Sequence, residues 1–231
     1  SLIGAQNLAL DGAISGTGGL LKSGSGDLIL NGNNTYQGDT LLGAGKLIVG
    51  SDSALGVGTL RATNNSTLDA STAVTLGNAV DIVGNLNIGG SADLTLDGVI
   101  TGTGDLTKNG AATLTLNGSN LYSGETILTA GTLVLGNNNA LGTGVLSVTG
   151  ASTLASGNSA VVVNNNIGLN NANLTVNGSN DLGLNGTIGG NGQLIKTGTG
   201  NLTLGGLNSY SGGTALNGGT LTLANGAALG S

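Results

Sequence analysis

The chain of 231 residues contains no proline, cysteine, methionine, tryptophan, phenylalanine or histidine, and its only aromatic residues are three tyrosines. The absence of cysteine excludes disulfides and thiol chemistry. The absence of histidine removes the side chain most often used as a general base near neutral pH. Because bulky rings are nearly absent, the core must be built from Leu, Val, Ile and Ala. We therefore expect a narrow and regular core.

Charge and long apolar runs are scarce as well. Charged residues make up 7% of the chain, the net charge is −6, and no run approaches the ~18 apolar residues of a membrane helix. An acidic chain with three widely spaced tyrosines offers neither a basic face nor a stacking platform, so we expect no nucleic acid partner. We also expect no membrane insertion by this segment. A hydrophobic content of 38% favours folding or aggregation over disorder.

The abundant residue is glycine, with 47 copies, and it recurs within a long repeat. Three stretches that begin at Leu8, Leu94 and Leu182 align without gaps. In this alignment the lysines correspond to one another, as do the tyrosines: Lys22, Lys108 and Lys196, and Tyr36, Tyr122 and Tyr210. Successive lysines are 86 and 88 residues apart. Such self-similarity at a nearly fixed offset indicates a repeat architecture.

A shorter period lies within the long one. L-x-L or L-x-V triplets begin at Leu8, Leu28, Leu47 and Leu68, and the second copy repeats the same intervals. The next interval is 18 residues in the first copy, from Leu68 to Leu86, and 20 residues in the second, from Leu154 to Leu174. We therefore expect length variation to be confined to this turn. Alternate side chains of a triplet point to opposite faces, which is typical of a strand. Gly and Asn follow most triplets and tolerate the backbone of a corner.

Two folds compete for this pattern. Asn-Gly pairs can close antiparallel hairpins, but hairpins do not require the sequence to resemble itself at a short fixed period, whereas stacked coils do. We therefore predict an all-β fold, a right-handed single-stranded parallel β-helix of roughly 10–11 coils with about 19–22 residues each. We predict that residues 1–231 form one β-solenoid segment with super-repeats at about 8–93, 94–181 and 182–231, the last incomplete.

The second copy carries a motif that can be read in three parts: Gly102-Thr103-Gly104-Asp105-Leu106-Thr107-Lys108, Leu114-Thr115-Leu116-Asn117-Gly118-Ser119-Asn120-Leu121-Tyr122-Ser123-Gly124-Glu125-Thr126, and Gly131-Thr132-Leu133-Val134-Leu135-Gly136. This motif resembles the passenger-associated transport repeat of Gram-negative autotransporters. The resemblance implies a parallel β-helix that is secreted through the outer membrane and displayed at the cell surface. It also implies that the chain is a segment of a longer passenger, because the family's translocator carries aromatic girdles that a chain with 1% aromatics does not contain.

Two kinds of chemical site can be weighed against this repetitive background. Polysaccharide lyases and hydrolases also use parallel β-helices, but they need converging acids or bases, and the eleven acids here are mostly at corners without histidine. Gly-x-Gly-Asp stretches are similar to calcium-binding repeats, but the third copy has Asn201 in place of the acid. We predict no catalytic residue, no cofactor and no metal site.

The repeated lysines and tyrosines are the remaining candidates. Lys22, Lys108 and Lys196 are weak candidates for binding an anionic glycan, although single solvated charges that discourage sheet aggregation are the favoured interpretation. Tyr36, Tyr122 and Tyr210 are weak candidates for stacking on sugars, although a ring that covers apolar surface at a corner is favoured. If the copies are four coils apart, equivalent residues lie about 19 Å from one another.

Three functions follow from these patterns. The favoured one is a non-enzymatic extracellular stalk or adhesin-like passenger segment whose partner is a host or sister-cell surface, glycan or protein. The second is a fibre that assembles end to end or flank to flank through open solenoid ends. The third is a glycan-processing enzyme.

Overall fold

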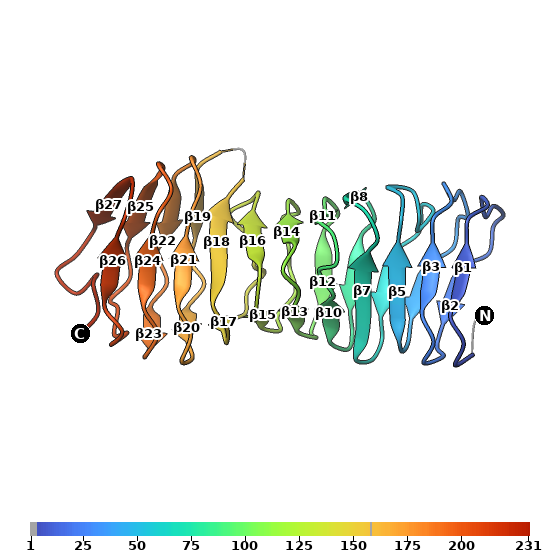
Figure 1. The fold of residues 1–231 in the computed structure, drawn as a ribbon, viewed down its shortest axis with the longest axis horizontal. Coiled ribbons are helices and arrows are strands. Elements are labelled where there is room, and N and C mark those ends of the chain that lie inside the picture. The colour runs from blue at the N-terminus through green and yellow to red at the C-terminus, as the bar shows by residue number, and fades with distance from the viewer. Residues whose placement is uncertain (1–3, 158) are drawn as a thin grey trace.

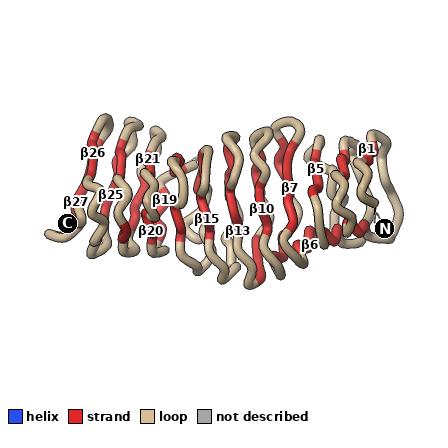
Figure 2. Tube along the Cα trace, turned by 60° about the horizontal axis from the view of Figure 1, so that its bottom comes forward, coloured by secondary structure: helices blue, strands red, loops and turns tan. Residues whose placement is uncertain are grey.

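The computed structural model describes residues 4–157 and 159–231, and in that part every regular element is a β-strand, so no helix there could cross a membrane. The strands are parallel and stack into a β-solenoid of about 11 turns, with the chain ends at opposite ends of a rod (Figure 1). The strands in the described residues have three to five residues each and are separated by loops at the corners of the rod (Figure 2). The predicted fold class is therefore confirmed.

Each turn of the rod has three sides, which we call faces 1, 2 and 3 in the order in which the chain visits them. Face 1 is a sheet of ten strands: β1 (Leu8–Leu10), β3 (Leu28–Leu30), β5 (Lys46–Val49), β7 (Ser66–Ala70), β10 (Leu86–Ile88), β13 (Leu106–Lys108), β15 (Thr126–Leu128), β17 (Leu146–Val148), β20 (Ile167–Leu169) and β23 (Ile188–Gly190). Face 2 has eight strands: β8 (Val74–Leu76), β11 (Leu94–Leu96), β14 (Thr113–Leu116), β16 (Thr132–Leu135), β18 (Ser152–Ser156), β21 (Leu174–Val176), β24 (Leu194–Lys196) and β26 (Thr214–Leu216).

Face 3 consists of two sheets along one side of the rod. The first sheet contains β2 (Leu20–Lys22), β4 (Thr40–Leu42), β6 (Leu60–Ala62), β9 (Val80–Ile82) and β12 (Ile100–Gly102). The second contains β19 (Val161–Val163), β22 (Leu182–Leu184), β25 (Asn201–Leu204) and β27 (Thr220–Leu223). Two loop layers lie between them, and backbone bonds such as Leu121 N to Ile100 O and Thr143 N to Tyr122 O continue the stacking through these layers.

The register explains the periodic recurrence of leucine. Leu28 pairs with both Leu8 and Leu47, and Leu47 in turn pairs with Leu68. These leucines lie directly above one another and fill a narrow core in which most are fully buried. The sequence predicts that Leu86 stacks on Leu68 in the next turn, but in the structure Leu68 pairs with Ile88.

The super-repeat is not a whole number of turns. Lys22 ends β2 on face 3, Lys108 ends β13 on face 1, and Lys196 ends β24 on face 2. One super-repeat therefore advances the chain by four turns and one third, and each copy presents the same motif on the next face. The expectation that equivalent residues lie one above the other, four coils apart, is wrong.

Acidic and amide side chains hold the corners together. The residue before many strands is Asp or Asn, and its side-chain oxygen accepts the backbone N–H of the equivalent residue one turn later. Asp93 Oδ1 accepts from Thr113 N at 2.7 Å, and Asp181 Oδ1 accepts from Asn201 N at 2.8 Å. These carboxylates satisfy backbone donors that would otherwise lack a partner at the corner. Their spacing along the chain is accounted for by this role.

Candidate functional site: three buried clamps

The motif shared by the three copies forms a buried cluster that joins three successive turns, and we call this cluster a clamp. The clamps lie within residues 14–56, 100–142 and 188–230, which we call modules I, II and III. In module II the Ile100 N–H donates to Asn120 Oδ1 at 2.8 Å, and Asn120 Nδ2 donates to the Ala140 carbonyl at 2.7 Å. A single buried asparagine therefore binds the turn before it and the turn after it.

The other two modules repeat this geometry. In module I the Ile14 N–H donates to Asn34 Oδ1 at 2.7 Å, and Asn34 Nδ2 donates to the Ala54 carbonyl at 2.6 Å. Ile188 N and Ala228 O are bound to Asn208 at 2.8 and 2.6 Å. Each asparagine is at least nine-tenths buried, so leaving either of its bonds unmade would cost the desolvation of an amide group.

The tyrosine of each clamp fills the interior. Tyr122 is completely buried, and its hydroxyl lies 2.5 Å from Thr126 Oγ1, which is also buried. Tyr36 pairs with Thr40 and Tyr210 pairs with Thr214 at the same distance. The structure thus places the three predicted tyrosines inside the rod, and they cannot stack on a sugar at the surface.

A tight turn of sequence Ala-Leu-Gly closes over each tyrosine. In module II it comprises Ala140, Leu141 and Gly142, and Gly142 has a φ of 58°. A Cβ on Gly142 would collide with the carbonyl oxygen of Tyr122 and press against its ring. Glycine is therefore required both by the left-handed backbone and by close contact with the tyrosine.

The lysines point inward, contrary to the expectation of solvated charges. Lys108 is the third residue of a Leu-Thr-Lys strand whose first residue faces the core, so the alternation of side chains turns Lys108 inward too. Its ammonium group donates to the carbonyl of Gly110 and, at 3.4 Å, to that of Ala130 in the next turn. Lys22 and Lys196 bind equivalent carbonyls, and all three lysines are 2% exposed or less. They cannot form a basic row for a glycan.

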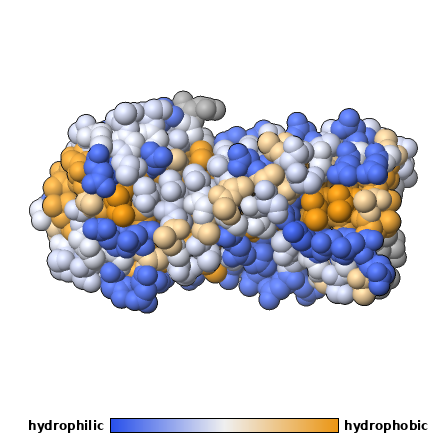
Figure 3. Space-filling view, in the orientation of Figure 1, coloured by the Kyte–Doolittle hydropathy of each residue, from blue (hydrophilic) through white to orange (hydrophobic). Residues whose placement is uncertain are grey.

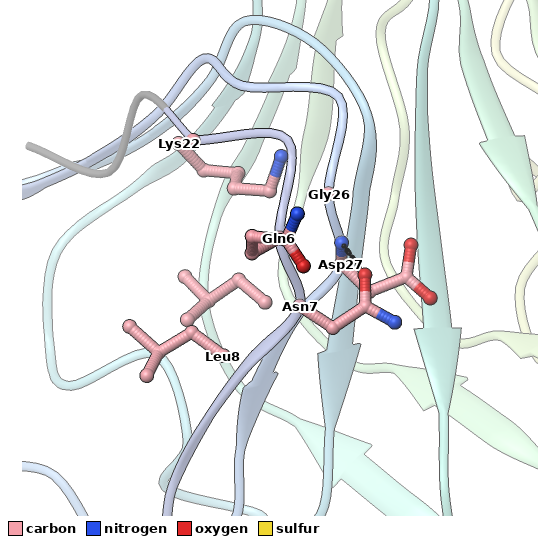
Figure 4. A pocket seen from close by; sticks show the side chains of 8 residues that line it. Gln6, Asn7, Leu8, Lys22, Gly26 and Asp27 are labelled. Atoms are coloured by element: carbon pink, nitrogen blue, oxygen red, sulfur yellow. Dashed lines mark hydrogen bonds between the residues drawn. The ribbon is translucent and has the colours of Figure 1, made fainter.

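The first lysine can be seen close to the N-terminal turn (Figure 4). It borders a cavity of about 250 Å³ lined also by Gln6, Asn7, Leu8 and Asp27, where Asp27 N donates to Asn7 Oδ1 at 2.8 Å. This cavity opens at the first turns of the rod and has mostly apolar walls. Its lining side chains include one ammonium group, that of Lys22, and one carboxylate, that of Asp27, and no second acid or base.

A polar cluster around Asp69, which no motif in the sequence predicts, joins residues from three turns. This carboxylate is buried, lies 2.6 Å from Lys46 Nζ, and accepts bonds from the Ser91 N–H and hydroxyl group. Burial alone would raise the pKa of Asp69, but the bonds to Lys46 and Ser91 together hold that pKa below its usual value. Among the residues that the structure describes, no three His, Cys, Asp or Glu side chains gather as a metal site would require.

Burial changes the ionisation of the clamp residues. Burial raises the pKa of the Tyr122 hydroxyl above its ordinary value of 10.0, with a smaller opposing effect from the bond to Thr126. Burial also lowers the pKa of Lys108, an effect opposed by the nearby carboxylates of Asp93 and Asp69. The interior therefore favours the neutral form of both groups.

A loss of stability above pH 10 follows from the raised tyrosine pKa values. Unfolded tyrosine loses its proton there while the folded side chain keeps it, so the unfolded state binds fewer protons and the free energy of unfolding falls as pH rises. The lowered pKa of a buried lysine has the opposite effect, a free energy of unfolding that rises with pH, but only at pH values below the ordinary lysine pKa of 10.5. Absorbance and circular dichroism recorded along an alkaline titration should show phenolate appearing together with loss of the β signal. Ionisation of all three tyrosines with an unchanged β signal would contradict this prediction.

Comparison with known proteins agrees with the clamp positions. Residues 20–49, 106–135 and 194–223 match the passenger-associated-transport-repeat family, and each match contains one clamp's tyrosine and lysine. These are the repeats of an autotransporter passenger. In each autotransporter repeat of this chain, therefore, the lysine, asparagine and tyrosine of the motif are buried side chains. The lysine and the asparagine bind neighbouring turns, and the tyrosine binds the threonine four residues further along the chain.

Named relatives point to the same class. The chain is 39% identical over 83 residues to the adhesin BmaC autotransporter of Brucella suis biovar 1, a match that covers 32% of the chain and 2% of the relative. It is 56% identical over 36 residues to the autotransporter lipoprotein NalP of Neisseria meningitidis serogroup B (strain MC58), covering 16% of the chain and 3% of that relative. The chain thus spans 2 to 3% of the length of these relatives. No solved structure matches it.

Proposed function

We propose that this autotransporter segment is a non-enzymatic stalk of a surface-displayed passenger, and that its rod holds other regions of the polypeptide away from the bacterial surface. The observation that carries the proposal is the use of the repeated motif. Its polar side chains are buried in clamps that join successive turns, and equivalent clamps appear on all three faces. The shared chemistry of the three copies thus serves the rigidity of a rod.

The display of this segment can be tested on Gram-negative cells that produce the parent polypeptide. We expect Fab fragments raised against the chain to label intact cells, and external protease to remove the label. A second arm uses a parent polypeptide without residues 123–210, one super-repeat of the rod. A stalk predicts that display persists while adhesion to host or sister cells falls, because the binding region lies closer to the cell. Labelling that appears only after the cells are permeabilised would refute the proposal.

Adhesion by the rod itself is a separable outcome of the same work. Beads coated with the purified chain bind cells if the flank of the rod is the adhesive surface, and they do not if the rod is only a stalk. Because one relative is named an adhesin, the bead assay is needed to distinguish an adhesive rod from a stalk. Incubation of the chain with common polysaccharides, followed by a reducing-sugar assay, tests the enzymatic alternative, and sugar release would overturn the non-enzymatic assignment.

Self-assembly has one structural observation in its favour. The outward residues Ala9, Ile29 and Ile48 stand in register on β1, β3 and β5, and an apolar stripe between two polar bands covers this part of the surface (Figure 3). The second copy has Thr95 and Thr115 at the positions of Ala9 and Ile29. Sedimentation velocity at increasing concentration distinguishes the two functions, since a stalk stays monomeric and a fibre-forming chain does not.

A further inference from the structure

The clamps divide the rod into two kinds of segment. Modules I to III, defined above, alternate with residues 57–99 and 143–187, which we call spacers. The spacers continue the parallel ladder with strands of comparable length. They contain no tyrosine, and so no clamp ring. The ladder alone therefore does not distinguish the two kinds of segment, whereas the buried side chains do.

Irregular features lie in the spacers. Within the described residues, Ser66 Oγ is the only buried side-chain polar atom without a hydrogen-bond partner, and it belongs to the first spacer. Asn171 is the only described non-glycine residue with a positive φ, 56°, and it belongs to the second. Both features cost free energy in a folded protein. The spacers thus combine the absence of clamps with local penalties.

The length of a turn also varies in the spacers. Leu68 pairs with Ile88 in the first spacer, whereas its equivalent Leu154 pairs with Val176 in the second, which makes the second turn longer than the first. The modules have no such difference, because the asparagine of every clamp binds partners one turn of 20 residues away on both sides. A clamp that reaches both neighbouring turns fixes their length. In the first spacer Asp69 also binds the turns on both sides, through Lys46 and Ser91, but this cluster is not repeated, because Ala155 occupies the equivalent position of the second spacer.

We infer that the modules are locks and the spacers are compliant segments, so that the rod opens first at residues 57–99 and 143–187. In a repeat protein whose turns contact only their neighbours, stability is set locally and opening begins where neighbouring turns are held least. The clamps add contacts that span three turns. Segments without them should therefore open more often, even in the interior of the rod.

Native-state hydrogen exchange of the intact chain, followed by mass spectrometry, tests this inference. The informative comparison is between β3–β5 of module I and β8–β10 of the first spacer, because β3–β5 lie closer to the end of the rod. We expect the amides of β3–β5 to exchange more slowly by a factor of about ten or more. Fraying from the ends predicts the opposite order. Uniform protection, or protection that falls steadily from the middle to both ends, would overturn the inference.

Variants of the central clamp supply a second measurement. Asn120→Ala removes both cross-turn bonds of module II, and we expect exchange in β12–β16 to rise to the level of the spacers. Asn109→Ala is the matched control, since Asn109 is exposed and outside the clamp. Tyr122→Phe keeps the ring and removes only the bond to Thr126, so it should raise exchange in the same strands by a smaller factor. Equal exchange in the Asn120→Ala and Asn109→Ala proteins would refute the role of the clamp.

Discussion

Replacement of Tyr122 by alanine is expected to lower the free energy of unfolding by about 3–5 kcal/mol, the range seen when a large buried aromatic side chain is truncated. Tyr122 is completely buried, and its loss leaves a cavity beneath the Ala140–Gly142 turn. It also leaves the buried Thr126 hydroxyl without its partner. The narrow core has no other ring nearby to fill the space. Chemical denaturation followed by circular dichroism measures the change.

Leu121→Ala is the matched control, because the neighbouring Leu121 side chain is 65% exposed. We expect it to change the free energy of unfolding by no more than about 0.5 kcal/mol. Tyr122→Phe should fall between the two, since it retains the ring and loses one buried hydrogen bond. Should Tyr122→Ala and Leu121→Ala prove equally stable, the tyrosine would not be a structural residue of the clamp.

Two deletions of similar length should differ strongly in stability. Deleting residues 123–210 joins Tyr122 to Ser211, so that Thr214 and Ala228 take the places of Thr126 and Ala140 in the clamp. Deleting residues 123–204 instead removes four turns along one face and places a strand where the clamp needs its Ala-Leu-Gly turn. The first protein should fold cooperatively. The second leaves a buried amide and a buried hydroxyl unpaired, at a cost of about 3 kcal/mol or more.

Denaturation midpoints of the two purified deletion proteins provide the measurement. Because both are shorter than the parent by about four turns, the loss of length affects them nearly equally. Equal midpoints would mean that the single turn, and not the super-repeat, is the structural unit of the rod. A lower midpoint for the protein without residues 123–204 would confirm that stability depends on keeping the residues of each clamp at their correct spacing along the chain.

Much of the fold could be predicted because strands and stacking leave a direct trace in the sequence. The triplet at Leu28 predicts a strand with two buried ends, and the recurrence of leucine at Leu47 and Leu68 predicts the residues stacked above it. Side chains that stack in register must be similar in shape, so a coil of constant length appears as a period. The clamp residues were visible in the same alignment as Asn120, Tyr122 and Thr126.

The inward direction of the lysines is also encoded in the sequence, although the usual preference of lysine for solvent suggests the opposite. Lys108 follows Leu106 by two residues in one strand, which places both side chains on the inner face. The usual preference of lysine for solvent argued against burial. What reverses that preference is a set of backbone carbonyls at a corner, among them Gly110 and Ala130, and these come together only when two turns are stacked.

The sequence by itself determined that the chain is a parallel β-solenoid of three related copies, because alternation along a strand and similarity between stacked turns are both local properties of the chain. Only the tertiary structure decided which face each copy occupies. The offset between copies can be divided into four longer turns or into four and a third shorter ones, and the backbone pairing of successive strands selects the second. That choice puts one clamp on each face of the rod.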